Sequence, residues 1–239
     1  MCCHLRLKIN NKFYIPIIVS LFIQIYFMKD LISEIYEIPF VSVMPGKEVN
    51  SQNIFNLWIG LCYIPIPFIL LTFSNDVKEL LNGYGKLLVI RNYSKRLLMV
   101  RTICKAVLQI GIVVLFTWIV QNVFLTNTGR YSLKVQALSI ILYILVFSSL
   151  VVLQYIFELF LSAQTANVII NAYIILSLLL WRPIMDISPY LNKILFINLG
   201  YINRNGGMSA IYKNMLSSFV ILLILAVICT EIFSRKDIL

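Results

Sequence analysis

The chain has 239 residues, of which 60% are hydrophobic and 13% charged, whereas a soluble domain is about 45–50% apolar and about 25% charged. A soluble core of this size cannot bury so many apolar side chains, so the composition excludes an ordinary soluble fold. The formal net charge is +10, and the densest basic cluster lies directly between two apolar blocks, so anionic lipid headgroups are the expected partner and nucleic acid is not.

Six apolar segments approach the roughly 20 residues that a helix needs to cross about 30 Å of hydrocarbon. Residues 137–180 contain one formal charge, Glu158, and would be about 66 Å long as one helix, so we expect a turn at Ser162–Thr165. The fifth span should end at 181–183, where an interfacial tryptophan, an arginine and a proline follow one another. We therefore predict a single all-α integral membrane domain over 1–239, with spans at about 13–28, 54–73, 103–125, 137–161, 166–180 and 215–233.

The distribution of Lys and Arg predicts the orientation of these spans. The N-terminal segment, the second connection and the tail together hold 12 of them, and the opposite side holds 8. Because positive residues favour the cytoplasmic side, both termini and the second connection are expected in the cytoplasm. The predicted localisation is the cell membrane, crossed several times.

The second connection is predicted to contain a short amphipathic helix lying along the membrane between spans two and three. Asp76 and Glu79 form a pattern that resembles a capping box at its start. Its apolar residues follow helical spacing and form one side: Val77, Leu80, Leu81 and Tyr84. The other side is expected to meet a partner: Asp76, Lys78, Glu79 and Asn82.

Glycines are expected to end this helix and let the chain turn into the third span. Gly83 and Gly85 tolerate the left-handed conformation found at helix C-termini. Ser94 can cap the following helix, which leaves Lys95 and Arg96 in a first turn that normally prefers acidic side chains. We infer that something other than helix stability placed these two cations there.

The connection 182–213, predicted on the outer side, mixes prolines and glycines with the apolar stretch 194–197. Nine or ten residues cannot cross a bilayer, so we expect short re-entrant or interfacial helices between spans five and six and no seventh span.

Catalytic motifs are missing from the sequence, and we expect a transport subunit and not an enzyme. No phosphate-binding loop occurs, the one histidine, His4, precedes the first span, and no predicted span contains an aspartate. We expect no resident cofactor or metal. Five cysteines without a C-x-x-C pair do not indicate a disulfide framework.

Polar side chains within the spans are the remaining candidates for a site. Buried carboxylates in lipid are functional hypotheses by default. Glu158 and Glu231 lie near the cytoplasmic ends of their helices, however, where they can also reach headgroup water or pair with Arg101 or Lys105. Amides more often bind neighbouring helices than a substrate. The candidates are Glu158, Glu231, Gln154 and Asn171.

This layout resembles the ABC-2 type permeases, which are the membrane subunits of ATP-binding cassette exporters. The sequence segments that carry the resemblance are Asp76-Val77-Lys78-Glu79, Gly83-Tyr84-Gly85 and residues 88–98. The resemblance implies a homo- or heterodimer of permease subunits, each resting its second connection on a separate ATPase subunit that binds the ATP. Its compact members export antimicrobial peptides or confer immunity to them. The implied coupling residues are Asp76, Lys78, Glu79, Asn82, Gly83, Gly85 and Arg91.

Two alternatives stay open. An intramembrane enzyme would need a catalytic set that the spans do not offer. An ion-coupled secondary transporter would usually show broken or charged spans in both halves. Pro16, Pro65 and Pro67 occur in the first two spans, without a matching pair in spans four and five.

Overall fold

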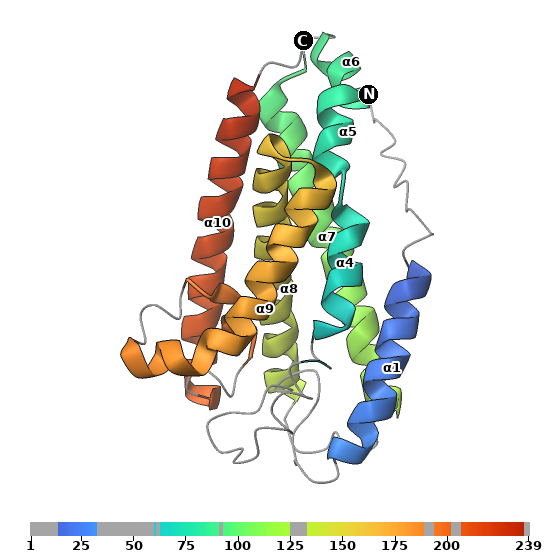
Figure 1. Ribbon diagram of the computed structural model, residues 1–239, viewed down its shortest axis with the longest axis vertical. Coiled ribbons are helices and arrows are strands. Elements are labelled where there is room, and N and C mark those ends of the chain that lie inside the picture. The colour runs from blue at the N-terminus through green and yellow to red at the C-terminus, as the bar shows by residue number, and fades with distance from the viewer. Residues whose placement is uncertain are drawn as a thin grey trace.

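The computed structural model describes residues 14–32, 60, 63–90, 93–124, 133–188, 194–201 and 207–236. These residues form helices and their connections, with no strand among them, as the sequence predicts (Figure 1). The elements in chain order are α1 (Tyr14–Ile32), α4 (Pro65–Phe73), α5 (Asp76–Asn82), α6 (Tyr84–Ile90), α7 (Lys95–Phe124), α8 (Leu133–Phe160), α9 (Ala163–Ile187), η4 (Phe196–Gly200), η6 (Gly207–Ala210) and α10 (Ile211–Arg235).

In the described part of the chain, four helices are long and apolar enough to cross a membrane, so the protein is a membrane protein. The four segments are Lys95–Val120, Lys134–Phe160, Ala163–Trp181 and Ile211–Arg235. They correspond to the last four predicted spans. The first predicted span corresponds to α1 and the second to α4, before which residues 51–59 lie outside the described ranges. The total of six spans stays a prediction.

Helix α8 is the centre of the bundle. It contacts α7, α9, α10 and η4, and 61% of its apolar stretch is buried, against 17% for α10. The outward faces of α7 and α10 carry large exposed apolar side chains, such as Leu108, Ile112, Leu216 and Val227. Lipid is the natural solvent for such faces, whereas α8 is enclosed by protein on most sides.

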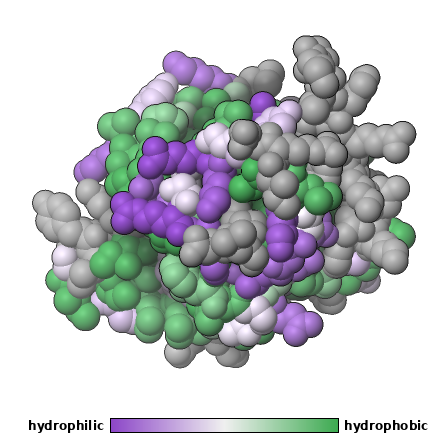
Figure 2. All heavy atoms as spheres, turned by 90° about the horizontal axis from the view of Figure 1, so that it is seen from above, coloured by the Kyte–Doolittle hydropathy of each residue, from purple (hydrophilic) through white to green (hydrophobic). Residues whose placement is uncertain are grey.

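The two ends of this bundle differ in their contents. We call one of them the α5 end: there α8 and α10 finish, α5, α7 and α9 begin, and Asn75 meets Glu158. We call the other the η4 end, where α9 finishes and α8 and α10 begin around η4. Seen from the α5 end, hydrophilic side chains gather over the middle of the face and hydrophobic ones line much of its periphery (Figure 2).

The predicted turn between α8 and α9 is confirmed. Helix α8 ends at Phe160, and α9 starts at Ala163. The hydroxyl of Ser162 accepts a hydrogen bond from the Thr165 backbone N–H at 3.1 Å, which caps α9.

The predicted end of the fifth span at 181–183 agrees with the apolar segment Ala163–Trp181, but the expectation that Pro183 ends the helix is wrong. Helix α9 continues to Ile187 with Pro183 inside it. A proline in the last turns removes one backbone donor, and the helix closes afterwards with Ser188 N–H bonded to the Ile184 carbonyl at 2.9 Å. Trp181 is 1% exposed, so its ring belongs to the core and not to the membrane interface.

The predicted short helices between spans five and six are present as η4 and η6. Residues 196–201 are buried against the bundle. The Asn198 amide donates to the Ser177 carbonyl at 3.0 Å, and the Tyr173 hydroxyl donates to the Ile194 carbonyl at 2.8 Å. Residues 196–201 are thus covered by protein and tied to α9 by these hydrogen bonds, whereas Ile194 is exposed.

Candidate functional site

Helix α5 packs its apolar side against protein. Its apolar side chains Val77 and Leu81 are 0% and 8% exposed, and the helix contacts α8. Helices α4, α5 and α6 follow one another along one flank of the bundle toward the α5 end (Figure 1). The predicted helix is therefore confirmed, and its apolar side is covered by α8, so this side is not left free for lipid.

A carboxylate from α8 caps the start of α5. Asn75 precedes the helix with a left-handed φ of 80°, a conformation that asparagine adopts more readily than most residues. Its backbone N–H donates to Glu158 Oε1 at 3.1 Å, and the Gln154 amide donates to the same oxygen at 3.1 Å. The first N–H groups of a helix lack acceptors within it. Glu158 of α8 provides the acceptor oxygen that a neighbouring residue in the chain normally provides.

Asp76 does not form the predicted capping box. Its carboxylate accepts a hydrogen bond from the Tyr155 hydroxyl at 2.8 Å, and Tyr155 is completely buried. Burial raises the pKa of Asp76 above its ordinary value, the Tyr155 hydrogen bond and the charge of Lys105 oppose this rise, and Glu79 adds to it. The prediction that Asp76 faces a partner protein is wrong, because its carboxylate is hydrogen-bonded to Tyr155 of α8.

We call this set of contacts the α5–α8 junction: Asn75, Asp76, Gln154, Tyr155 and Glu158. It joins residues about 80 positions apart in the chain, as the Asn75–Glu158 hydrogen bond spans 83 positions. Two oxygens in it, Gln154 Oε1 and Glu158 Oε2, are buried without a hydrogen-bond partner. The junction therefore holds α5 firmly and keeps spare acceptor capacity inside the protein.

The other polar residues of α5 lie where the sequence predicts. Glu79 and Asn82 are exposed, and Lys78 is half-buried. Arg91 lies outside the described residues.

The two glycines after α5 are needed for close backbone approach and not for a left-handed turn. Gly83 has φ −110° and ψ −128°, and a Cβ placed there would lie 2.8 Å from the Glu79 carbonyl oxygen. A Cβ on Gly85 would overlap the Leu80 carbonyl, and Gly85 has no positive φ either. The expectation of a left-handed helix end is wrong, yet both positions still require glycine because α5 and α6 approach so closely.

The cations at the start of α7 have tertiary partners. Lys95 Nζ donates to the Lys236 carbonyl at 2.8 Å, and Lys236 Nζ donates to the Leu159 carbonyl. Burial and the nearby charge of Lys78 lower the pKa of Lys236. These contacts explain basic residues in a first turn, because they tie α7, α8 and α10 together at the α5 end.

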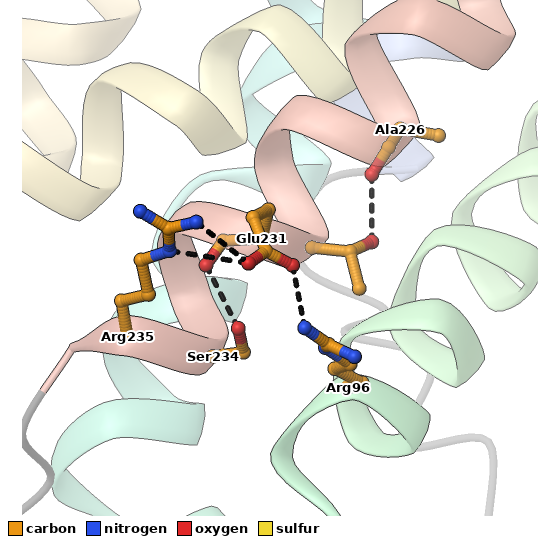
Figure 3. A network of polar contacts seen from close by, with 6 residues as sticks. Arg96, Ala226, Glu231, Ser234 and Arg235 are labelled. Carbon is orange, nitrogen blue, oxygen red and sulfur yellow. Dashed lines mark hydrogen bonds and ion pairs between the residues drawn. The ribbon is translucent and has the colours of Figure 1, made fainter.

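Glu231 has partners that the sequence did not predict. It accepts hydrogen bonds from Arg96 at 2.9 Å and from Arg235 at 3.1 Å, on α7 and α10 respectively (Figure 3). The expected pairing of the glutamates with Arg101 or Lys105 is wrong for Glu231, and Glu158 is 0% exposed and reaches no headgroup water.

The last intramembrane candidate joins helices, as expected of an amide. Asn171 accepts from the Tyr63 hydroxyl at 3.0 Å and donates to the Asn167 carbonyl at 2.8 Å. Asn171 thus links α9 to the residues before α4, away from the α5–α8 junction.

Tyr155 and Asn75 were missed by the sequence reasoning. A tyrosine among the apolar residues of a span gives no sign of a carboxylate partner 79 positions away. Within the described ranges, no group of three or more His, Cys, Asp and Glu side chains lies close enough to hold a metal ion. Among the described residues, the arrangement fixes the start of α5 to α8 through the Asn75–Glu158 and Asp76–Tyr155 hydrogen bonds.

Comparison with known proteins gives a family without an assigned activity. Neither the curated proteins nor the solved structures contain a match to the chain. One family matches residues 14–239, which is nearly the whole sequence. The chain therefore belongs to the family described as a protein of unknown function, DUF2705.

Proposed function

We propose that the chain is the permease subunit of an ABC-2 type exporter, with six spans in the cell membrane, both termini in the cytoplasm and energy supplied by a separate ATPase subunit. One observation carries this proposal: α5 is fixed to the central helix α8 by the Glu158 and Tyr155 hydrogen bonds, while its Glu79 side is exposed. When a partner protein displaces a surface helix that is anchored in this way, the displacement is transmitted to α8.

The length of α5 supports this function. A seven-residue helix is too short to be stable in water by itself, so its rigidity depends on the protein it packs against. Val77 and Leu81 supply the packing, and Glu158 supplies the cap. A partner that moves α5 therefore has to move the end of α8 with it, unless the junction breaks.

The α5 end also couples the neighbouring helices. Helix α6 and the start of α7 follow α5 in the chain, and Lys95 and Lys236 connect α7 to α10 and α8. Force applied at α5 thus reaches three long apolar helices at one end of the bundle. Such convergence suits a permease that alternates between two arrangements of its spans.

The proposed partners are an ABC ATPase, which binds the ATP, and a second permease subunit, identical or different. The exposed Glu79 and Asn82 with the half-buried Lys78 are the proposed contact with the ATPase. Transport of an antimicrobial peptide, for export or immunity, is proposed from the resemblance alone.

The first test is co-purification of the tagged full chain from its host membranes in mild detergent. The charge reversal Glu79→Lys should reduce the amount of bound ATPase at least tenfold. Lys134→Glu is the matched control, because Lys134 is exposed at the η4 end and should not contact the ATPase. Equal ATPase with both variants would remove α5 from the contact, and no ATPase with the unaltered chain would defeat the permease proposal.

A second variant separates binding from transmission. Tyr155→Phe leaves the exposed side of α5 untouched and removes the hydrogen bond to Asp76. We expect it to keep the ATPase bound and to reduce the permease-dependent change in ATP hydrolysis severalfold. Normal ATP hydrolysis together with normal binding would show that α5 transmits nothing through this contact.

One observation favours an ion-coupled transporter as the second candidate. Gln154 Oε1 and Glu158 Oε2 are buried acceptors without a hydrogen-bond partner, and buried polar groups within spans mark ion and proton pathways in transporters. Uptake or release driven by an ion gradient in proteoliposomes that lack any ATPase would favour this candidate. Activity that requires the ATPase and ATP would exclude it.

A further inference from the structure

A groove runs between α7 and α10 on the outside of the bundle. Its volume is about 480 Å³, within the roughly 300–1,000 Å³ of small-molecule sites. Its walls are apolar along most of their length, and charged groups stand only at the α5 end. The lining residues are Arg96, Val100, Ile103, Cys104, Leu222, Leu223, Ala226, Val227, Thr230 and Glu231.

The length of the groove matches one leaflet of a bilayer. Its α10 wall extends from Leu222 to Glu231, which is about 14 Å at 1.5 Å per residue. Half of the roughly 30 Å hydrocarbon core is about 15 Å. Both walls belong to helices that are apolar enough to span, and both finish at the α5 end with charged residues.

Arg96 and Glu231 line the mouth of the groove, and Arg235, which does not line it, lies beside the mouth through its contact with Glu231. Arg96 and Arg235 share the single carboxylate of Glu231, which leaves the trio with a net positive charge (Figure 3). The Arg96 and Arg235 side chains are 65% and 79% exposed, so their remaining N–H groups are open to a ligand. Guanidinium groups bind phosphate oxygens in pairs, and basic pockets between membrane helices bind acidic lipid headgroups.

We propose that this groove is a binding site for one anionic phospholipid. An acyl chain lies along Val100, Ile103 and Leu223, and the headgroup phosphate binds Arg96 and Arg235. Apolar walls of one-leaflet length select a chain, and the cationic mouth selects the charge of the headgroup. A second copy of the protein is disfavoured as the occupant, because two cationic mouths would meet at a two-fold interface and repel each other.

The test measures the thermal stability of the purified full chain in neutral detergent with added phosphatidylglycerol or phosphatidylcholine. Phosphatidylglycerol should raise the midpoint of unfolding more than phosphatidylcholine does, and Arg96→Gln with Arg235→Gln should abolish this difference. Arg101→Gln is the control, since Arg101 is exposed on α7, does not line the groove and, unlike Arg96 and Arg235, forms no ion pair with Glu231. The comparison of two lipids within each variant cancels any effect of the substitution on basal stability.

The acyl chain and the headgroup are tested separately. Ala226→Phe fills the apolar part without changing any charge, and it should weaken phosphatidylglycerol binding at least fivefold in native mass spectrometry. Val220→Phe, at an exposed position of α10 outside the groove, should not. Glycerol phosphate, which has no acyl chain, should not reproduce the stabilisation. Equal effects of glycerol phosphate, or of phosphatidylcholine, would overturn the site as an anionic phospholipid site.

Cys104 reports which molecule occupies the groove. It lines the groove and is exposed, whereas Cys229 is buried. In a chain whose other cysteines are replaced by serine or alanine, maleimide should modify Cys104 more slowly in phosphatidylglycerol vesicles than in phosphatidylcholine vesicles. A Cys104–Cys104 cross-link formed in membranes at high yield would overturn the proposal in favour of a second copy, and equal rates in the two vesicles would overturn it as well.

Discussion

Two glutamates lie at the same end of the bundle, each within the last turns of a long apolar helix, and their surroundings give them opposite roles. Glu158 on α8 is 0% exposed and accepts the backbone N–H of Asn75, just before α5, and the side-chain amide of Gln154. Glu231 on α10 has a side chain 39% exposed and accepts two guanidinium groups. The first fixes a helix, and the second balances part of a cationic groove mouth.

The difference shows that burial determines how much a carboxylate near the end of a span contributes to stability. A buried acceptor that loses its role leaves donors without partners, at a cost of about 1–3 kcal/mol for each. An exposed ion pair is screened by water and salt and contributes little to stability.

The largest effect is expected at Glu158. Replacement by alanine removes the acceptor of Asn75 N–H and of the Gln154 amide inside a buried junction. We expect the free energy of unfolding in detergent to fall by about 2–4 kcal/mol, because the buried Gln154 amide is left unpaired and the start of α5 loses its cap. Glu158→Gln keeps an oxygen at the same place and should cost less than half as much. Equal losses for the two variants would contradict the capping role.

A smaller effect, with a defined pH dependence, is expected at Asp76. Because burial raises its pKa, the folded state holds this proton more tightly than the unfolded state. Stability should therefore fall as the pH rises from about 4, the ordinary carboxyl value, through the raised pKa, and level off above it. Asp76→Asn keeps an acceptor for the Tyr155 hydroxyl and removes the titration. The difference in stability between the two proteins should shrink at acidic pH, and a constant difference would contradict the raised pKa.

Local signals in the sequence predicted the elements of this fold well. Hydrophobic blocks indicated the long helices, the polar tetrad at 162–165 indicated the turn that Ser162 caps, and the spacing of Val77 and Leu81 indicated α5 and its buried side. In each case the deciding interactions lie within a few residues, so periodicity and capping preferences carry the information.

Contacts between distant segments were not predictable in the same way. The Asp76–Tyr155 hydrogen bond joins residues 79 positions apart, and the Arg96–Glu231 pair joins residues 135 apart. Asp76 has the right position for a cap, and only the neighbouring α8 draws it into the protein. Pro183 misled for the related reason that a helix with enough tertiary support tolerates one missing donor in its last turns. The candidate site was thus partly predictable. The pattern of apolar residues predicted α5, but no local signal predicted its hydrogen bonds to α8.

The smallest effect on stability is expected at Glu231. Replacement by glutamine removes the charge that Arg96 and Arg235 share, but both arginines are exposed and can be solvated by water. We therefore expect no measurable change in the midpoint of unfolding in neutral detergent, at low or at high salt. The same substitution raises the positive charge at the groove mouth by one, so it should strengthen the preference for phosphatidylglycerol over phosphatidylcholine in native mass spectrometry. A marked loss of stability would give Glu231 a structural role like that of Glu158 and would erase the contrast between the two glutamates.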